Sequence, residues 1–251
     1  MLWIRLAVLC VMVGLLHSVA VVAQASSNRL AATSGSGTER VLNAPYSTRR
    51  RFTSIKKLAN GKLDRTESGG SEARDSQGRT YSAGERQWTY LEGKKSVLKS
   101  EMLYRIEDPV ANTTTKWDSS SKIVKVIHWP PITTKESNSF AQSEAAWDNA
   151  MASAFGEPEK LGTKTLEGVV VEGTRSSYTV PVGRDHHDQP IVVTHEIWYS
   201  PELKIVVLET NDDPRRSTTK NAFVNIGRGE PNVRPYQPPS DYIVRKVQMP
   251  D

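Results

Sequence analysis

Ile-Val-Val-Thr-His-Glu-Ile-Trp-Tyr, residues 191–199, is followed by Ser200-Pro201-Glu202 and then by Leu-Lys-Ile-Val-Val-Leu-Glu, residues 203–209. Both runs are rich in β-branched residues, and the first places large apolar side chains on both faces of a period-two pattern. The Ser-Pro-Glu segment is typical of a tight turn, so the two runs predict a hairpin. A strand that is apolar on both faces has to be covered on both sides, by a helix, a second layer or a ligand.

Similar alternation recurs outward along the chain in both directions, broken by turn residues such as Asn60-Gly61 and Asp108-Pro109. Counted this way, the sequence predicts about eleven strands. They cover residues 52–58, 62–67, 86–91, 102–107, 123–129, 166–175, 177–182, 191–199, 203–209, 221–228 and 242–247. No fixed-period repeat and no alternation of strands with helices is visible, which favours one antiparallel sheet over parallel βαβ units.

The pattern changes to a helical period between residues 139 and 155, where Phe140, Trp147 and Met151 fall on one side and Gly156 follows as a stop. The predicted fold class is therefore mainly β (α+β). We expect a single curved antiparallel sheet, or an incomplete β-barrel, with one main helix packed on its concave face.

Composition narrows the class of protein. The chain has 251 residues, of which 37% are hydrophobic and 24% charged, with a net charge of +5. This apolar content supports a real core and excludes wholesale disorder, and a mean hydropathy of −0.50 excludes a polytopic membrane protein. The single cysteine, Cys10, lies in the N-terminal apolar run, so the rest of the chain has no disulfide or thiolate metal site.

Residues 1–25 have the layout of a secretory signal peptide, with Arg5, an apolar run and Ala-Gln-Ala at positions 23–25. We expect cleavage after Ala25, a flexible linker over residues 26–45 and a single β-rich domain over residues 46–251. An uncleaved membrane anchor is the alternative, because the apolar run approaches the length of a membrane span. A lipoprotein is disfavoured because Leu9 precedes Cys10.

A signal peptide followed by a chain without cysteine fits a protein exported to the periplasm or cell envelope of a bacterium. Membrane contact after cleavage would be at most peripheral. Residues 40–65 carry eight basic residues and one acid, which favours anionic lipid headgroups or an acidic partner. Nucleic acid is not expected as a partner, since no aromatic residues are interleaved with these charges in the way nucleic-acid sites require.

Only one cluster suggests metal chemistry. His186, His187 and Asp188, with His195 nearby, offer imidazole and carboxylate ligands for zinc or copper. Adjacent side chains on an extended segment diverge, so we expect a solvated loop and no metal site. No nucleophile, zinc-protease or phosphate-loop motif occurs, and we predict that the chain is not an enzyme and has no cofactor.

Seven stretches resemble a group of uncharacterised exported bacterial proteins, many of them acidobacterial, and the match preserves their order. They are Leu58-Ala-Asn-Gly-Lys62, Ala73-Arg-Asp-Ser-Gln-Gly-Arg-Thr80, Ile106-Glu-Asp-Pro-Val-Ala111, Glu167-Gly-Val-Val-Val-Glu-Gly-Thr-Arg175, Ile197-Trp-Tyr-Ser-Pro-Glu-Leu203, Asp213-Pro-Arg215 and Asn225-Ile-Gly-Arg-Gly-Glu-Pro231.

That group is distantly similar to the periplasmic lipoprotein-carrier (LolA/LolB-like) superfamily. The similarity implies a curved, incompletely closed antiparallel sheet with helices in its concave face, which binds acyl chains or lipids or senses the state of the envelope. It implies no catalytic motif, and no functional residue carries over.

Together these features predict an exported, non-enzymatic protein that holds a hydrophobic or lipid-like ligand by burying apolar surface. The candidate lining residues are Trp88, Tyr104, Trp147, Met151, Ile197 and Trp198. The alternative is an envelope protein-interaction or sensor module without a ligand cavity, with the basic stretch and the proline-rich residues 229–240 as contact surfaces.

Overall fold

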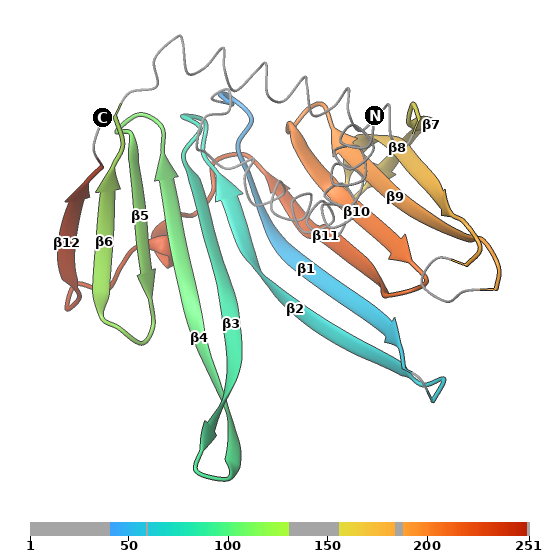
Figure 1. The fold of residues 1–251 in the computed structure, drawn as a ribbon. Coiled ribbons are helices and arrows are strands. Elements are labelled where there is room, and N and C mark those ends of the chain that lie inside the picture. Colours follow the sequence, from blue (N-terminus) through green and yellow to red (C-terminus); the bar gives the residue numbers. More distant parts are fainter. Residues whose placement is uncertain (1–40, 59, 131–155, 184–187, 250–251) are drawn as a thin grey trace, which may run out of the picture.

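The structure is a computed structural model that describes residues 41–58, 60–130, 156–183 and 188–249. These residues form one sheet of twelve strands in the order β12-β6-β5-β4-β3-β2-β1-β11-β10-β9-β8-β7 (Figure 1). The strands are β1 (Tyr46–Lys57), β2 (Leu63–Arg74), β3 (Thr80–Glu92), β4 (Lys95–Asp108), β5 (Thr113–Asp118), β6 (Ile123–His128), β7 (Glu159–Leu166), β8 (Val169–Val180), β9 (Ile191–Ser200), β10 (Ile205–Asp213), β11 (Ser217–Arg228) and β12 (Ile243–Gln248).

The sheet is curved and open, with β12 and β7 at its two edges (Figure 1). Every pairing is antiparallel except that of β12 with β6, which is parallel. The expectation of a mainly β chain in a single curved sheet is confirmed. The described part of the chain contains one short 3₁₀ helix, η2 (Arg234–Tyr236), and no helix there is long and apolar enough to cross a membrane. The helix expected over residues 139–155 lies outside the described residues and stays a prediction.

A buried polar cluster joins the middle of the sheet to the turn between β9 and β10. The Tyr46 hydroxyl on β1 donates a hydrogen bond of 2.6 Å to the buried carboxylate of Glu72 on β2. Arg74 lies over the Tyr46 ring and donates to the carbonyl oxygens of Ala44 and Leu203. Burial raises the pKa of Glu72, because a charged carboxylate loses its hydration there. These contacts satisfy backbone and side-chain groups that would otherwise be buried without partners.

Apolar packing is divided between two clusters. The larger joins β1 to the strands at the β7 edge through Tyr46, Val169, Val171, Trp198, Leu203, Ile205, Val207 and Phe223. In the smaller, Tyr236 of η2 packs on Ala73 and Tyr81, with ring centroids of the two tyrosines 5.7 Å apart. The proline-rich segment that carries η2 therefore covers part of one face of the sheet before it reaches β12 (Figure 1).

A facing pair of glycines marks the point where β2 and β3 separate. Gly70 and Gly84 are register partners, and the two strands do not pair beyond them toward the hairpin tips. A methyl group on Gly70 would collide with the backbone carbonyl oxygen of Ala83, whereas one on Gly84 would have its nearest neighbour, the Gly69 carbonyl oxygen, at 3.8 Å. Gly70 thus allows a close backbone approach, and Gly84 leaves open space above the sheet.

Past these glycines the β3–β4 hairpin extends on its own. Residues 86–101 have strand partners only in each other, because β4 meets β5 first at Leu103 and Met102 exchanges hydrogen bonds with Ser119 just before it. The hairpin diverges from the β1–β2 hairpin in Figure 1. Its outer part exposes Leu91 and Leu98 to 75% and 64%. A two-stranded ribbon of this kind receives no support from a third strand.

Replacement of Tyr46 by Phe is expected to lower the free energy of unfolding by about 1–3 kcal/mol, because the buried Glu72 carboxylate loses its closest donor. Chemical denaturation of the purified full chain measures it. Tyr81→Phe is the matched control: its hydroxyl donates to Asp75, which also accepts from Arg79, so its loss should be smaller. Equal losses in the two variants would contradict the special role of the Glu72 site.

Gly70→Ala is expected to lower stability by more than about 1 kcal/mol, because the new methyl group forces β2 away from β3. For Gly84→Ala, on the partner strand, the free energy of unfolding should be at most about 1 kcal/mol below that of the parent, or higher than it. The two melting temperatures, measured side by side, check this. A Gly70→Ala protein as stable as Gly84→Ala would show that the strands do not approach as described.

Candidate functional site

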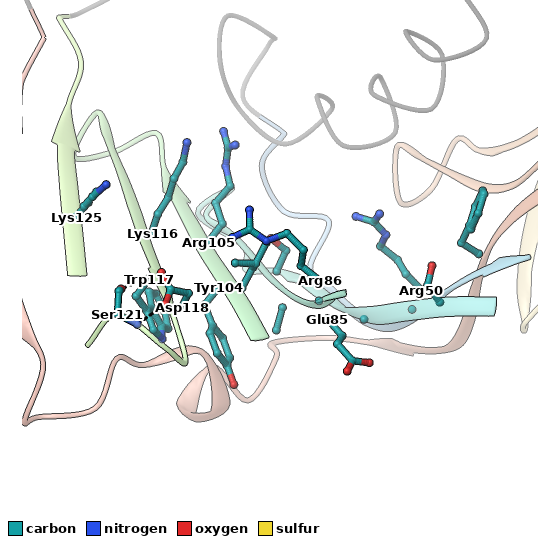
Figure 2. A pocket seen from close by; sticks show the side chains of 18 of the residues that line it. Arg50, Glu85, Arg86, Tyr104, Arg105, Lys116, Trp117, Asp118, Ser121 and Lys125 are labelled. Atoms are coloured by element: carbon teal, nitrogen blue, oxygen red, sulfur yellow. Dashed lines mark hydrogen bonds between the residues drawn. The ribbon is translucent and has the colours of Figure 1, made fainter. Parts of the chain in front are cut away.

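A hollow of about 670 Å³ lies over strands β1 to β6. We call it the basic trough and define it by its five cationic lining residues, Arg50, Arg86, Arg105, Lys116 and Lys125. Figure 2 shows these five side chains directed to the same side of the sheet, although they come from five different strands. Among the described residues the hollow is partly open to solvent, and we describe it as a trough.

Strand register places the cations on one face. Arg105 of β4 is the partner of Lys116 of β5, and Lys116 is the partner of Lys125 of β6. Register partners point to the same face, and successive residues alternate between faces. Tyr104 and its partner Trp117 consequently point the other way (Figure 2).

Three of the five cations are paired with buried carboxylates: Arg50 with Glu72 at 3.7 Å, Arg86 with Glu101, and Arg105 with Glu107. Burial raises the pKa of Glu107, although Thr114 and Arg105 donate to it. In the part of the chain that the structure describes, neither the Lys116 nor the Lys125 ammonium has a carboxylate within 4.0 Å. The two lysines therefore have no direct ion pair, although the Asp118 carboxylate lines the same end of the trough and the charge of Glu107 acts on Lys116 from farther away.

The trough also has apolar and uncovered backbone surface. Phe52, Leu103 and Ile123 line it beside the backbone of Gly69, Gly70 and Gly84. Beneath it, on the opposite face, the Tyr104 and Trp117 rings stack with centroids 5.0 Å apart and an interplanar angle of 1°. This stack fixes β4 against β5 and so holds Arg105 and Lys116 at a set spacing.

The residues expected to line a ligand site are spread over the sheet. Tyr104 borders the basic trough but its ring points to the opposite face, Trp88 lies farther out on the β3–β4 hairpin, and Ile197 and Trp198 lie on β9 toward the other edge. Trp198 is buried, with the Lys164 ammonium 3.3 Å from its ring centroid. Trp147 and Met151 lie outside the described residues. The structure does not bring the four described residues together, and their role as ligand contacts stays a prediction.

Of the histidines considered for a metal, His195 is the one that the structure describes; His186 and His187 lie outside the described residues. Its Nε2 atom lies 2.7 Å from Glu209 Oε1, and Asn221 donates to the other oxygen of Glu209 at 3.4 Å. Within the described ranges no three His, Cys, Asp or Glu side chains gather as a metal site would require. The expectation that the histidine cluster is inert stays a prediction.

Sequence reasoning singled out Arg50 as part of the basic stretch but not the other trough cations. A signal for two of them is present: Leu103-x-Arg105 and Ile123-x-Lys125 each place an apolar and a basic residue on one face of a strand. Charged residues on a strand face are ordinarily solvated, so this pattern does not by itself indicate a binding site. It does so only when the strand register places the charges side by side.

No family model matches the chain, and no curated protein matches it in sequence. Among solved structures, it is similar to a chain of the MucA/MucB complex of Pseudomonas aeruginosa, with 12% identity and a TM-score of 0.38. That match covers 80% of this chain and 59% of the other, so this chain spans less than two thirds of the length of that neighbour. LprF from Mycobacterium bovis matches with 11% identity and a TM-score of 0.31, over 78% of this chain and 90% of LprF. Neither overlap reaches a TM-score of 0.5, so neither assigns a function.

Asp118, which lines the trough at the start of the β5–β6 turn, yields a prediction for acid pH. Partial burial disfavours its charge, but hydrogen bonds from Ser120 and Ser121 outweigh this and lower its pKa to about 2. The stability that the carboxylate contributes should be complete above its ordinary pKa of 3.8 and disappear as the pH falls through about 2.

The measurement compares Asp118→Asn with the parent by denaturation between pH 2 and pH 6. The parent should be more stable at the upper end of this range and lose that advantage at the lower end. A difference that does not change with pH would show that the carboxylate charge makes no such contribution.

Proposed function

We propose that this chain is a non-enzymatic binding protein of the bacterial cell envelope that holds a lipid-like ligand in the basic trough. The observation that supports this most directly is the trough itself, where Phe52, Leu103 and Ile123 lie beside five cationic side chains. Burying a ligand chain against such residues yields about 25 cal/mol for each Å² of apolar surface removed from water.

The proposal includes the arrangement expected from the sequence. Residues 1–25 serve as the export signal, residues 26–45 as a linker, and residues 46–251 as the binding domain. The resemblance to exported bacterial proteins supports this arrangement, as does the lack of cysteine after residue 25.

A second candidate function is a protein-interaction module of the envelope. The observation that favours it is the unsupported β3–β4 hairpin, which exposes Leu91 and Leu98 and pairs with no other strand beyond Gly84 and Leu103. Exposed apolar residues on a protruding hairpin are typical of contact surfaces. Crosslinking in intact cells from a photoreactive residue at position 91 would capture such a partner.

Native mass spectrometry of the full chain, exported to a bacterial periplasm and purified without detergent, tests the main proposal. We expect a co-purifying mass that organic extraction identifies as a lipid. Gly84→Leu should reduce the loaded fraction severalfold, because its side chain would enter the open space of the trough.

Gln87→Leu is the matched control. It adds a similar side chain to an exposed position of the same strand that does not line the trough, and it should leave the loaded fraction unchanged. A bare polypeptide mass for the parent, or equal loading of parent and Gly84→Leu, would argue against the trough as the lipid site.

A further inference from the structure

Three cations form a straight row across adjacent strands at one end of the basic trough. Arg105, Lys116 and Lys125 are successive register partners on β4, β5 and β6. Neighbouring strands lie about 4.8 Å apart, so the three side chains arise within about 10 Å of each other. Figure 2 shows them extending side by side in the same direction.

Within this row, charge is only partly balanced. Arg105 is paired with Glu107, but the ammonium groups of Lys116 and Lys125 have no carboxylate within 4.0 Å among the described residues. Like charges placed directly opposite each other on neighbouring strands destabilise a sheet. Partial burial, followed by the charge of Arg105, lowers the pKa of Lys116, and the charge of Glu107 opposes this lowering in part. A row that costs the folded protein stability is typical of a functional site.

Apolar residues adjoin the row on the same face. Leu103 precedes Arg105 by two residues on β4, and Ile123 precedes Lys125 by two residues on β6; both line the trough. Two residues span about 7 Å along a strand. On β5, between these two strands, the register partner of Leu103 is Asp118, whose carboxylate accepts hydrogen bonds from Ser120 and Ser121. One step along the strands from the cationic row, the trough thus presents two apolar side chains flanking this hydrogen-bonded carboxylate, and the apolar side chains match the tail of a molecule with an anionic head.

We infer that Arg105, Lys116 and Lys125 bind the phosphate group of an anionic amphiphile, whose apolar part lies against Leu103 and Ile123. A phosphate group has several anionic oxygens and can therefore contact all three cations at once. The Arg105 guanidinium would donate two parallel hydrogen bonds, and the two lysine ammonium groups would each form an ion pair. This inference rests on the proposed function and narrows its lipid-like ligand to one with a phosphate headgroup.

The test titrates the full chain with three probes by calorimetry at fixed ionic strength, below the micelle concentration of the lipids. The probes are dioctanoyl phosphatidate, dioctanoylglycerol with the same acyl chains but no phosphate, and inorganic phosphate. We expect dioctanoyl phosphatidate to bind at least about tenfold more tightly than either of the others, because only it engages both parts of the trough.

The variant K116Q/K125Q removes two charges of the row. It should weaken phosphatidate binding by about tenfold for each lysine and leave dioctanoylglycerol binding unchanged. K116R/K125R keeps the charge and should retain most of the affinity. K116Q/K125Q relieves repulsion between like charges but also removes the attraction between Lys116 and the buried Glu107 carboxylate, so its melting temperature should stay close to that of the parent, which separates a binding defect from misfolding.

K94Q/K95Q is the matched control for net charge, since both lysines are exposed at the tip of the β3–β4 hairpin and neither lines the trough. It should bind phosphatidate like the parent. An equal loss in K94Q/K95Q and K116Q/K125Q would overturn the inference, because overall charge would then explain the binding.

Other outcomes separate the inference from the proposed function. Dioctanoylglycerol bound as tightly as phosphatidate would overturn the phosphate site and leave the proposed function standing. Inorganic phosphate bound as tightly as phosphatidate would overturn the amphiphile, because the acyl chains would add nothing. Binding of none of the three probes would overturn the inference, and the proposed function would then depend on the native mass spectrum alone.

Discussion

The arrangement of the sheet depends on the contacts of one buried carboxylate, that of Glu72. It lies on β2, accepts the Tyr46 hydroxyl of β1, and is paired with Arg50, which lines the basic trough. Arg74, two residues along β2, reaches the carbonyl oxygen of Leu203 in the turn between β9 and β10. Tyr46, Arg50, Glu72 and Arg74 all lie on the β1–β2 hairpin, and the hydrogen bond from Arg74 to Leu203 links this cluster to the other half of the sheet. A buried charge without partners is strongly destabilising, so this link favours the assembled sheet. The same cluster that fixes the sheet also orients one wall of the proposed ligand site.

The sequence predicts the type of fold well because burial on one face leaves a period-two pattern. The turns at Asn60-Gly61 and Gly78 are correct, and both glycines have positive φ. The prediction was wrong for some strands. The β3–β4 hairpin is much longer than the two short strands expected over residues 86–91 and 102–107. On β4 the missed residues 95–100 are mostly exposed and show no alternation, whereas on β3 the missed residues 80–85 include the buried Thr80 and Tyr81. Likewise β5 was missed, since its run of threonines does not alternate in polarity.

The candidate site could be predicted only in part. Tyr104 was expected to contact a ligand, but its ring points to the face opposite the trough, and its role as a ligand contact stays a prediction. The row of Arg105, Lys116 and Lys125 could not be found in the same way. Its three members are separated along the chain, and each taken alone is an ordinary solvated charge. The pairing register of β4, β5 and β6 brings the three side chains together. The hydrophobic pattern of the sequence does not specify this register to the exact residue.

The position of β1 at the centre of the sheet has a consequence for how the chain folds. Strand β1 pairs with β11, and the hydrogen bond from Thr48 to the Val224 carbonyl joins residues 176 apart in the sequence. The hairpins on either side of this seam involve nearby residues and can form early, but the seam itself has to wait for almost the entire chain. Such non-local pairing slows folding and leaves the β1 edge free in the meantime. The β1–β11 seam therefore joins two blocks of strands late in synthesis, and the parallel pairing of β12 with β6 waits for residues even nearer the C-terminus.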